Sequence, residues 1–166
     1  MDIFAHGLWT YAIFNKKKYV WMATLFGVLP DLLSFGILFV FGLFTGTLPH
    51  GKPALSSLPN WLFSAYNMTH SLIVFAVVFA FVFLITKKWF WPMLGWPIHI
   101  LIDIPTHSTM FFPTPFLWPL ADYRFNGISW GTPWFMLLNY SSILVVYLWI
   151  AHSRAKSKKK SKKQHK

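Results

Sequence analysis

Two histidines and one aspartate recur at every fourth position of an apolar stretch near the middle of the chain: His99, Asp103 and His107. Residues four apart share one face of an α-helix, so His99 and Asp103 can act on a common ligand. Imidazole and carboxylate groups bind zinc and other first-row divalent ions. Pro105 lies between Asp103 and His107 and could turn His107 away from this face.

Three further ionisable residues, His6, Asp31 and His70, also lie within apolar segments. Ionisable groups in a membrane interior are costly and are functional candidates by default. Counted from the nearest lysine cluster, Asp31 lies about 20 Å, His99 about 17 Å and Asp103 about 23 Å along its helix. By the same rise, His70 lies about 26 Å along, and His6 about 15 Å if its segment rises from Lys16. We therefore expect one polar layer that several helices supply.

The elements that must position this layer are apolar helices. Only 11% of the 166 residues are charged and 55% are hydrophobic, whereas a soluble domain carries about a quarter charged residues. A span needs about 20 apolar residues. The sequence predicts an all-α, multi-pass helical membrane protein with four transmembrane helices, at residues 19–44, 61–86, 89–105 and 128–151. Residues 3–14 are expected to form a short helix, either inserted in the membrane or interfacial.

Charge patterning predicts the topology. The net charge of +11 is concentrated in two lysine clusters, at 16–18 and 87–88, and in a tail at 152–166. Basic clusters beside apolar spans are typical of the cytoplasmic side and of contacts with anionic lipid. We expect one domain, at residues 1–151, that is embedded in the inner membrane. Residues 152–166 are expected to form a disordered tail in the cytoplasm. Nucleic acid is not an expected partner, and the sequence does not indicate an oligomeric state.

Structural roles compete with metal binding at each position. Asp31 follows Pro30 and could cap a helix; His99 and Asp103 could form a structural pair that joins helices; His70 could make a single hydrogen bond between helices. However, the predicted spans contain no lysine or arginine to neutralise Asp31 and Asp103. A buried carboxylate needs a counter-charge, and a divalent ion would supply it.

The order of motifs along the chain resembles a known family. The motifs are His6–Gly7, LPD at 29–31, THS at 69–71, GWPIHILIDIPTH at 95–107 and PFLWPL at 115–120. This set resembles the bacterial and archaeal inner-membrane metal-dependent hydrolases that are sometimes described as LexA-binding. The resemblance covers roughly residues 6–130 and implies a multi-pass membrane protein whose His and Asp residues bind metal.

Two departures from the family pattern leave alternatives open. Leu33 stands where many members have a second acidic residue, and Tyr66, Asn67 and Met68 replace a His-Arg-Gly triplet. The site could hold one metal ion instead of two, accept a changed substrate, or be degenerate. His107 could compensate as an additional ligand.

Together, the residues and the resemblance predict a membrane-embedded metal-dependent hydrolase. The expected ligands of a divalent ion are His6, Asp31, His70, His99, Asp103 and His107, with zinc favoured and manganese the alternative. Asp31 or Asp103 would serve as general base. The expected substrate is a phospholipid or a lipid-linked phosphate ester that enters from the outer leaflet, where Arg124 could contact its phosphate. The alternatives are a small metal-ion or proton transporter and a non-catalytic regulatory membrane protein.

Overall fold

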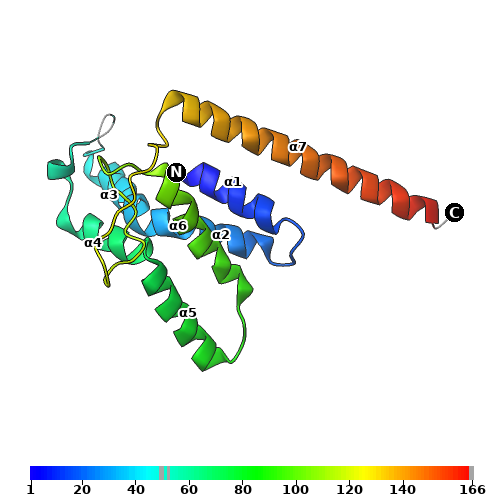
Figure 1. The fold of residues 1–166 in the computed structure, drawn as a ribbon, viewed down its shortest axis with the longest axis horizontal. Coiled ribbons are helices and arrows are strands. Elements are labelled where there is room, and N and C mark those ends of the chain that lie inside the picture. Colours follow the sequence, from blue (N-terminus) through cyan, green and yellow to red (C-terminus); the bar gives the residue numbers. More distant parts are fainter. Residues whose placement is uncertain (49–50, 52, 165–166) are drawn as a thin grey trace.

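The computed structural model describes residues 1–48, 51 and 53–164, and every regular element in these residues is a helix (Figure 1). In chain order the elements are α1 (Ile3–Phe14), α2 (Val20–Asp31), the π-helical turn η1 (Leu32–Gly36), α3 (Ile37–Thr45), the short 3-10 helix η2 (Leu55–Ser57), α4 (Asn60–Thr69), α5 (Leu72–Thr86), the 3-10 turn η3 (Trp91–Leu94), α6 (Gly95–Thr106) and α7 (Pro133–Gln164). The all-α prediction is confirmed for these residues.

Within the described residues, two helices are long and apolar enough to cross a membrane, fewer than the four expected. They are the continuous α2–η1–α3 rod, Val20–Thr45, and the first 25 residues of α7, Pro133–Ser157. Helices α4 and α5 would make a third span if counted together, although they meet at a bend of 62°.

The expected third span, residues 89–105, is not a spanning helix. It consists of η3 followed by the 12-residue α6, with proline at positions 92, 97 and 105. Twelve residues rise only about 18 Å, well short of the roughly 30 Å hydrocarbon core. Helix α6 instead packs in the interior of the bundle, against α1, α2 and α5.

Small residues let α1, α2 and α6 approach closely. Gly27 of α2 faces Thr10 of α1, and a Cβ at position 27 would lie 2.3 Å from Thr10 Oγ1. Gly95 of α6 faces α2, and a Cβ there would lie 2.0 Å from the carbonyl oxygen of Ala23. Close approach at small residues is the usual way in which membrane helices associate. These two contacts bring the polar faces of three helices to one point.

The break between α4 and α5, at His70 and Ser71, is stabilised by specific hydrogen bonds. Ser71 Oγ caps α5 by accepting from the backbone N–H groups of residues 73 and 74, each at 3.1 Å. The indole of Trp96 donates to the Thr69 carbonyl at 2.6 Å, and Leu72 N–H donates to the carbonyl of residue 116 at 3.0 Å. Because the freed backbone groups find these partners, the chain can turn here and direct His70 inwards.

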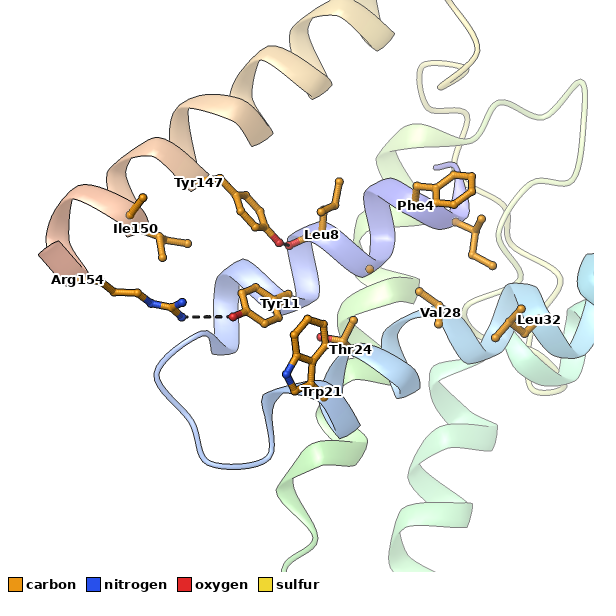
Figure 2. A pocket seen from close by; sticks show the side chains of 13 residues that line it. Phe4, Leu8, Tyr11, Trp21, Thr24, Val28, Leu32, Tyr147, Ile150 and Arg154 are labelled. Atoms are coloured by element: carbon orange, nitrogen blue, oxygen red, sulfur yellow. Dashed lines mark hydrogen bonds between the residues drawn. The ribbon is translucent and has the colours of Figure 1, made fainter.

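Helix α7 lies along α1. Trp9 Nε1 donates to Asn139 Oδ1 at 2.9 Å. Tyr147 Oη donates to the carbonyl of Leu8 at 3.0 Å (Figure 2). The helix also continues past the expected end of the membrane domain, as far as Gln164. The expectation of a disordered tail at 152–166 therefore differs from the structure over 152–164, where lysine, alanine and glutamine favour helix propagation. Residues 165–166 lie outside the described part.

Candidate metal centre

Asp103 is the centre of the polar cluster, and its two carboxylate oxygens face different partners. Its Oδ1 lies 2.9 Å from His6 Nε2 and 3.3 Å from His107 Nε2. Its Oδ2 lies 3.2 Å from His99 Nε2 and 3.6 Å from His70 Nε2. Histidines that are up to 101 positions apart in the chain thus surround one carboxylate, which is 1% exposed.

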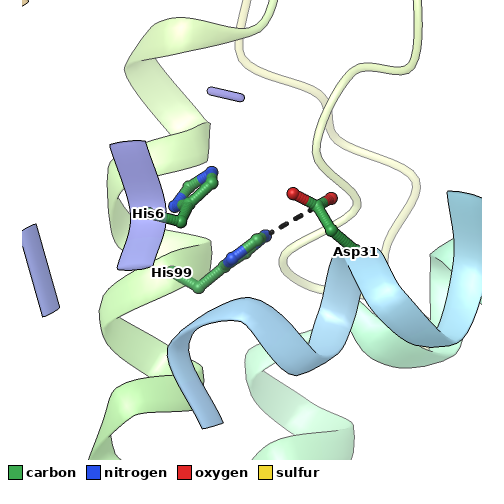
Figure 3. A group of neighbouring side chains, drawn as sticks. All are labelled: His6, Asp31 and His99. Atoms are coloured by element: carbon green, nitrogen blue, oxygen red, sulfur yellow. Dashed lines mark ion pairs between the residues drawn. The ribbon is translucent and has the colours of Figure 1, made fainter. Parts of the chain in front are cut away.

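Asp31 completes the cluster from α2. Its Oδ1 lies 3.8 Å from His99 Nε2 (Figure 3). The same oxygen lies 3.5 Å from His70 Nε2. It makes no helix-capping hydrogen bond, which removes the capping alternative for this residue. Asp31 immediately precedes the π-helical turn η1, and π-helical turns are frequent at functional sites. At 15% side-chain exposure it is the most accessible member of the cluster.

Backbone carbonyls fix the tautomer of three imidazoles. Nδ1 of His99 lies 2.7 Å from the Gly27 carbonyl, Nδ1 of His70 lies 3.1 Å from the Tyr66 carbonyl, and Nδ1 of His107 lies 2.8 Å from the Phe112 carbonyl. A carbonyl oxygen only accepts, so in each neutral ring Nδ1 carries the hydrogen. The lone pair of each Nε2 therefore points into the cluster, as in a typical metal-binding histidine.

The Nε2 atoms of His70 and His99 are 3.1 Å apart. When both rings are neutral, neither atom has a hydrogen to donate to the other, so two lone pairs meet at contact distance. Asp103 Oδ2 is next to them and is also without a hydrogen-bond partner, although it is buried. Buried acceptors that face one another without a donor are unfavourable. A metal ion among them, or a proton on one Nε2, removes this conflict.

His6 reaches the cluster with one nitrogen and leaves the other free. Because the Asp103 carboxylate accepts, Nε2 donates to it, and the buried Nδ1 has no partner. Helix α1 is not one of the candidate spans. Burial is the main cause that lowers the pKa of His6 to about 4. Its imidazole is thus neutral at pH 7, the form that binds metals. The ring stacks on His99, with ring centroids 3.6 Å apart (Figure 3).

The geometry brings five of the predicted ligands into two triads that could hold a metal ion. One is His6, Asp31 and His99, and the other is His70, His99 and Asp103; within each triad the ligand atoms lie within 4.8 Å of one another. Both triads contain His99, whose Nδ1 is bound to the Gly27 carbonyl. With only Nε2 to offer, His99 can serve one ion, so the triads describe a single centre.

Sequence reasoning missed the α-amino group of Met1. This group forms an ion pair with Asp103 Oδ1 and lies 3.0 Å from His107 Nε2. The expectation that Asp103 has no positive partner except a metal ion therefore needs correction, because it considered only lysine and arginine side chains. His107 joins the amine on the Oδ1 side of the carboxylate, and neither triad includes it.

Tyr66 is a second residue that sequence reasoning did not place at the site. Its ring stacks on His70 with centroids 3.8 Å apart, and its hydroxyl donates to the Phe112 carbonyl at 2.9 Å. The same carbonyl accepts from His107. Tyr66 lies four positions before His70, and this spacing could have indicated that the two side chains are neighbours. The contact with Phe112 could not be foreseen in this way, because Phe112 lies 46 residues further along the chain, in a loop.

No protein-family model, curated protein or solved structure matches this chain. The resemblance to the inner-membrane hydrolases thus remains a prediction.

Proposed function

We propose that the protein is a membrane-embedded metal-dependent hydrolase of the family that its motif order resembles. The observation that carries the proposal is the approach of two imidazole lone pairs, from His70 and His99, to 3.1 Å beside a buried carboxylate oxygen without a donor. The two candidate spans support the membrane location.

Zinc is the favoured ion. Nitrogen and carboxylate ligands in a compact group suit zinc, which takes four ligands at about 2.0–2.2 Å. His70, His99 and Asp103 offer three, and Asp31 lies within 3.8 Å of both imidazoles. The ion would polarise the scissile group and lower the pKa of a water molecule. A single ion also agrees with the absence of a second acidic residue at Leu33.

Asp31 is the better candidate for general base. Asp103 is enclosed by histidine nitrogens and the Met1 amine, so its role is to hold the site together. Asp31 contacts the same imidazoles but is partly exposed, so a water molecule and a substrate can reach it. In hydrolysis Asp31 would accept a proton from the attacking water, and that proton would pass to the oxygen that leaves when the ester bond breaks.

A lipid-linked phosphate ester is the favoured substrate. Arg124 lies in the long loop between α6 and α7, which contacts the α4–α5 break through residues 116 and 118. Its Nη2 donates to Asp122 at 3.3 Å, but its Nη1 is buried without a partner. A phosphate oxygen could accept from this nitrogen. A substrate in the membrane also fits a site at the centre of a helical bundle.

The proposal is tested by metal analysis of the protein purified in detergent. We expect about one zinc per chain in the wild type, and a loss of at least ten-fold in His99→Ala and in Asp103→Asn. His152→Ala, an exposed histidine of α7, is the matched control and should keep its zinc. Circular dichroism confirms that the variants remain helical. Replacing a buried side chain can disturb folding. His70→Gln is therefore included as a third variant, because glutamine keeps a polar side chain at this position.

The competing explanation is a metal-free network, in which the Met1 amine and protonated histidines neutralise Asp103. This explanation predicts folded wild-type protein that contains no metal and does not respond to added zinc, a result that would overturn the proposal. If zinc is bound, release of phosphate or alcohol from defined phospholipids then tests hydrolysis, with Asp31→Asn expected to retain zinc more than activity.

A further inference from the structure

An apolar groove of about 850 Å³ runs between α1, α2 and α7, away from the metal centre. Phe4 and Leu32 line one end and Arg154 lines the other, with Tyr11, Trp21 and Tyr147 between them (Figure 2). It exists because α7 packs on α1 and leaves the neighbouring face of α2 open. His6 is on a different face of α1, so the groove is separate from the metal ligands.

A second, smaller pocket of about 310 Å³ continues the groove at its charged end. The two share Ile150 and Arg154, and the smaller one is also lined by Asn15, Lys16 and Ser153. The apolar groove thus leads into a polar pocket with two positive side chains. This arrangement matches an amphiphile that has a long apolar part and an anionic head.

Arg154 is held in position at the junction of the two pockets. Its Nη2 donates to the Asn15 carbonyl at 3.1 Å and to Tyr11 Oη at 3.4 Å, and the guanidinium lies 6.0 Å from the centre of the Tyr11 ring. A guanidinium has five N–H donors, and both hydrogen bonds use the same nitrogen. The exposed remainder can therefore bind a phosphate group.

Tryptophans mark the depth of this junction. Trp21 lines the groove and Trp149 lines the polar pocket, and both are exposed, at 71% and 61%. Tryptophan is enriched at the boundary between hydrocarbon and head groups. Lys16–Lys18 lie next to this boundary in the turn between α1 and α2. The charged end of the groove therefore suits the depth of a phospholipid phosphate.

We propose that the groove between α1, α2 and α7 is a binding site for one anionic phospholipid, with an acyl chain along Val28 and Leu8 and the phosphate between Arg154 and Lys16. The bound lipid is not a substrate, because its phosphate lies at the opposite end of the groove from Leu32, the neighbour of Asp31. The inference does not depend on the proposed hydrolase activity.

The test is native mass spectrometry of the protein in a non-ionic detergent, with added dioleoyl-phosphatidylglycerol or dioleoyl-phosphatidylcholine. We expect one phosphatidylglycerol to be retained at concentrations at which phosphatidylcholine is not. Arg154→Gln should weaken this binding about fivefold, whereas Lys156→Gln, which removes the same charge outside the groove, should not. Equal retention of both lipids, or equal effects of the two substitutions, would overturn the proposal.

Two further comparisons test the groove itself. Ala151 lines it and Ala155 does not, so Ala151→Phe should block lipid retention while Ala155→Phe leaves it unchanged. Millimolar inorganic phosphate should not displace the lipid; displacement would mean that the polar pocket alone binds an anion and that the groove is not used. Zinc content should be unaffected in all four variants, which separates this result from the fate of the proposed function.

Discussion

The Nε2 atoms of His70 and His99 lie 3.1 Å apart, although the two residues are 29 positions apart in the chain. Each ring donates its Nδ1 hydrogen to a backbone carbonyl, of Tyr66 and of Gly27 respectively. Two lone pairs are consequently directed at one point beside Asp103 Oδ2. This relationship supports the proposed metal centre over an ordinary hydrogen-bonded pair of helices.

Zinc should stabilise the folded protein through this pair. After treatment with EDTA, added zinc at about 100 times its Kd should raise the free energy of unfolding by about 2.7 kcal/mol. The increase is measured as a higher Tm from tryptophan fluorescence in detergent. His99→Ala should show no such increase, whereas His152→Ala should behave as wild type. An equal shift in His99→Ala would place zinc elsewhere on the protein.

His107 should support the centre without binding the ion. Its Nε2 faces Asp103 Oδ1 and the Met1 amine, and both triads exclude it. We expect His107→Ala to keep bound zinc but to lose about 10-fold in affinity, as is usual when a residue that orients a ligand is removed. Competition with a chromogenic zinc chelator measures the affinity. A loss of all zinc, as in His99→Ala, would make His107 a direct ligand.

Replacing the glycines between α1, α2 and α6 even by alanine should destabilise the protein. In Gly27→Ala the new Cβ would meet Thr10 Oγ1 at 2.3 Å, and in Gly95→Ala it would meet the Ala23 carbonyl oxygen at 2.0 Å. We expect each substitution to lower the free energy of unfolding by about 1–3 kcal/mol, seen as a lower Tm. Gly131→Ala, with no atom within 4 Å of the new Cβ, is the control.

A second substitution separates these two contacts. Thr10→Ala removes the Oγ1 that a Cβ at position 27 would meet but leaves the Thr10 Cβ at 2.8 Å. It should therefore partly restore the Tm of Gly27→Ala and leave that of Gly95→Ala unchanged, because the latter clash is with backbone. If Thr10→Ala rescued both variants equally, the helices would not be packed as the structure has them.

Ser71 should contribute more to the free energy of unfolding than an exposed serine does. Its Oγ accepts from two N–H groups at the start of α5 and donates to the carbonyl of residue 118. Ser71→Ala should lower the free energy of unfolding by about 1–2 kcal/mol and should also reduce zinc binding, because the neighbouring His70 is then held less firmly. Ser57→Ala, which changes an exposed serine, is the control for Tm and zinc content. Unchanged zinc content in Ser71→Ala would show that the cap does not orient His70.

The sequence by itself predicted the composition of the polar cluster. Rare aspartates and histidines within apolar segments, and the four-residue spacing of His99 and Asp103, predicted a shared polar layer to which Asp31, His70 and His6 belong. The spacing of His99 and Asp103 was informative because helical periodicity follows directly from position in the chain. The all-helical architecture followed from the same apolar runs.

Only the tertiary structure decided how the layer is held. The broken helix at His70–Ser71 and the short α6 reduced the number of candidate spans, since their freed backbone groups find partners such as Trp96 that are distant in sequence. The carbonyl of Gly27 sets the tautomer of His99, and the Met1 amine reaches Asp103. Backbone carbonyls and chain termini have no side-chain signature, so these contacts appear only once α1, α2 and α6 are packed together.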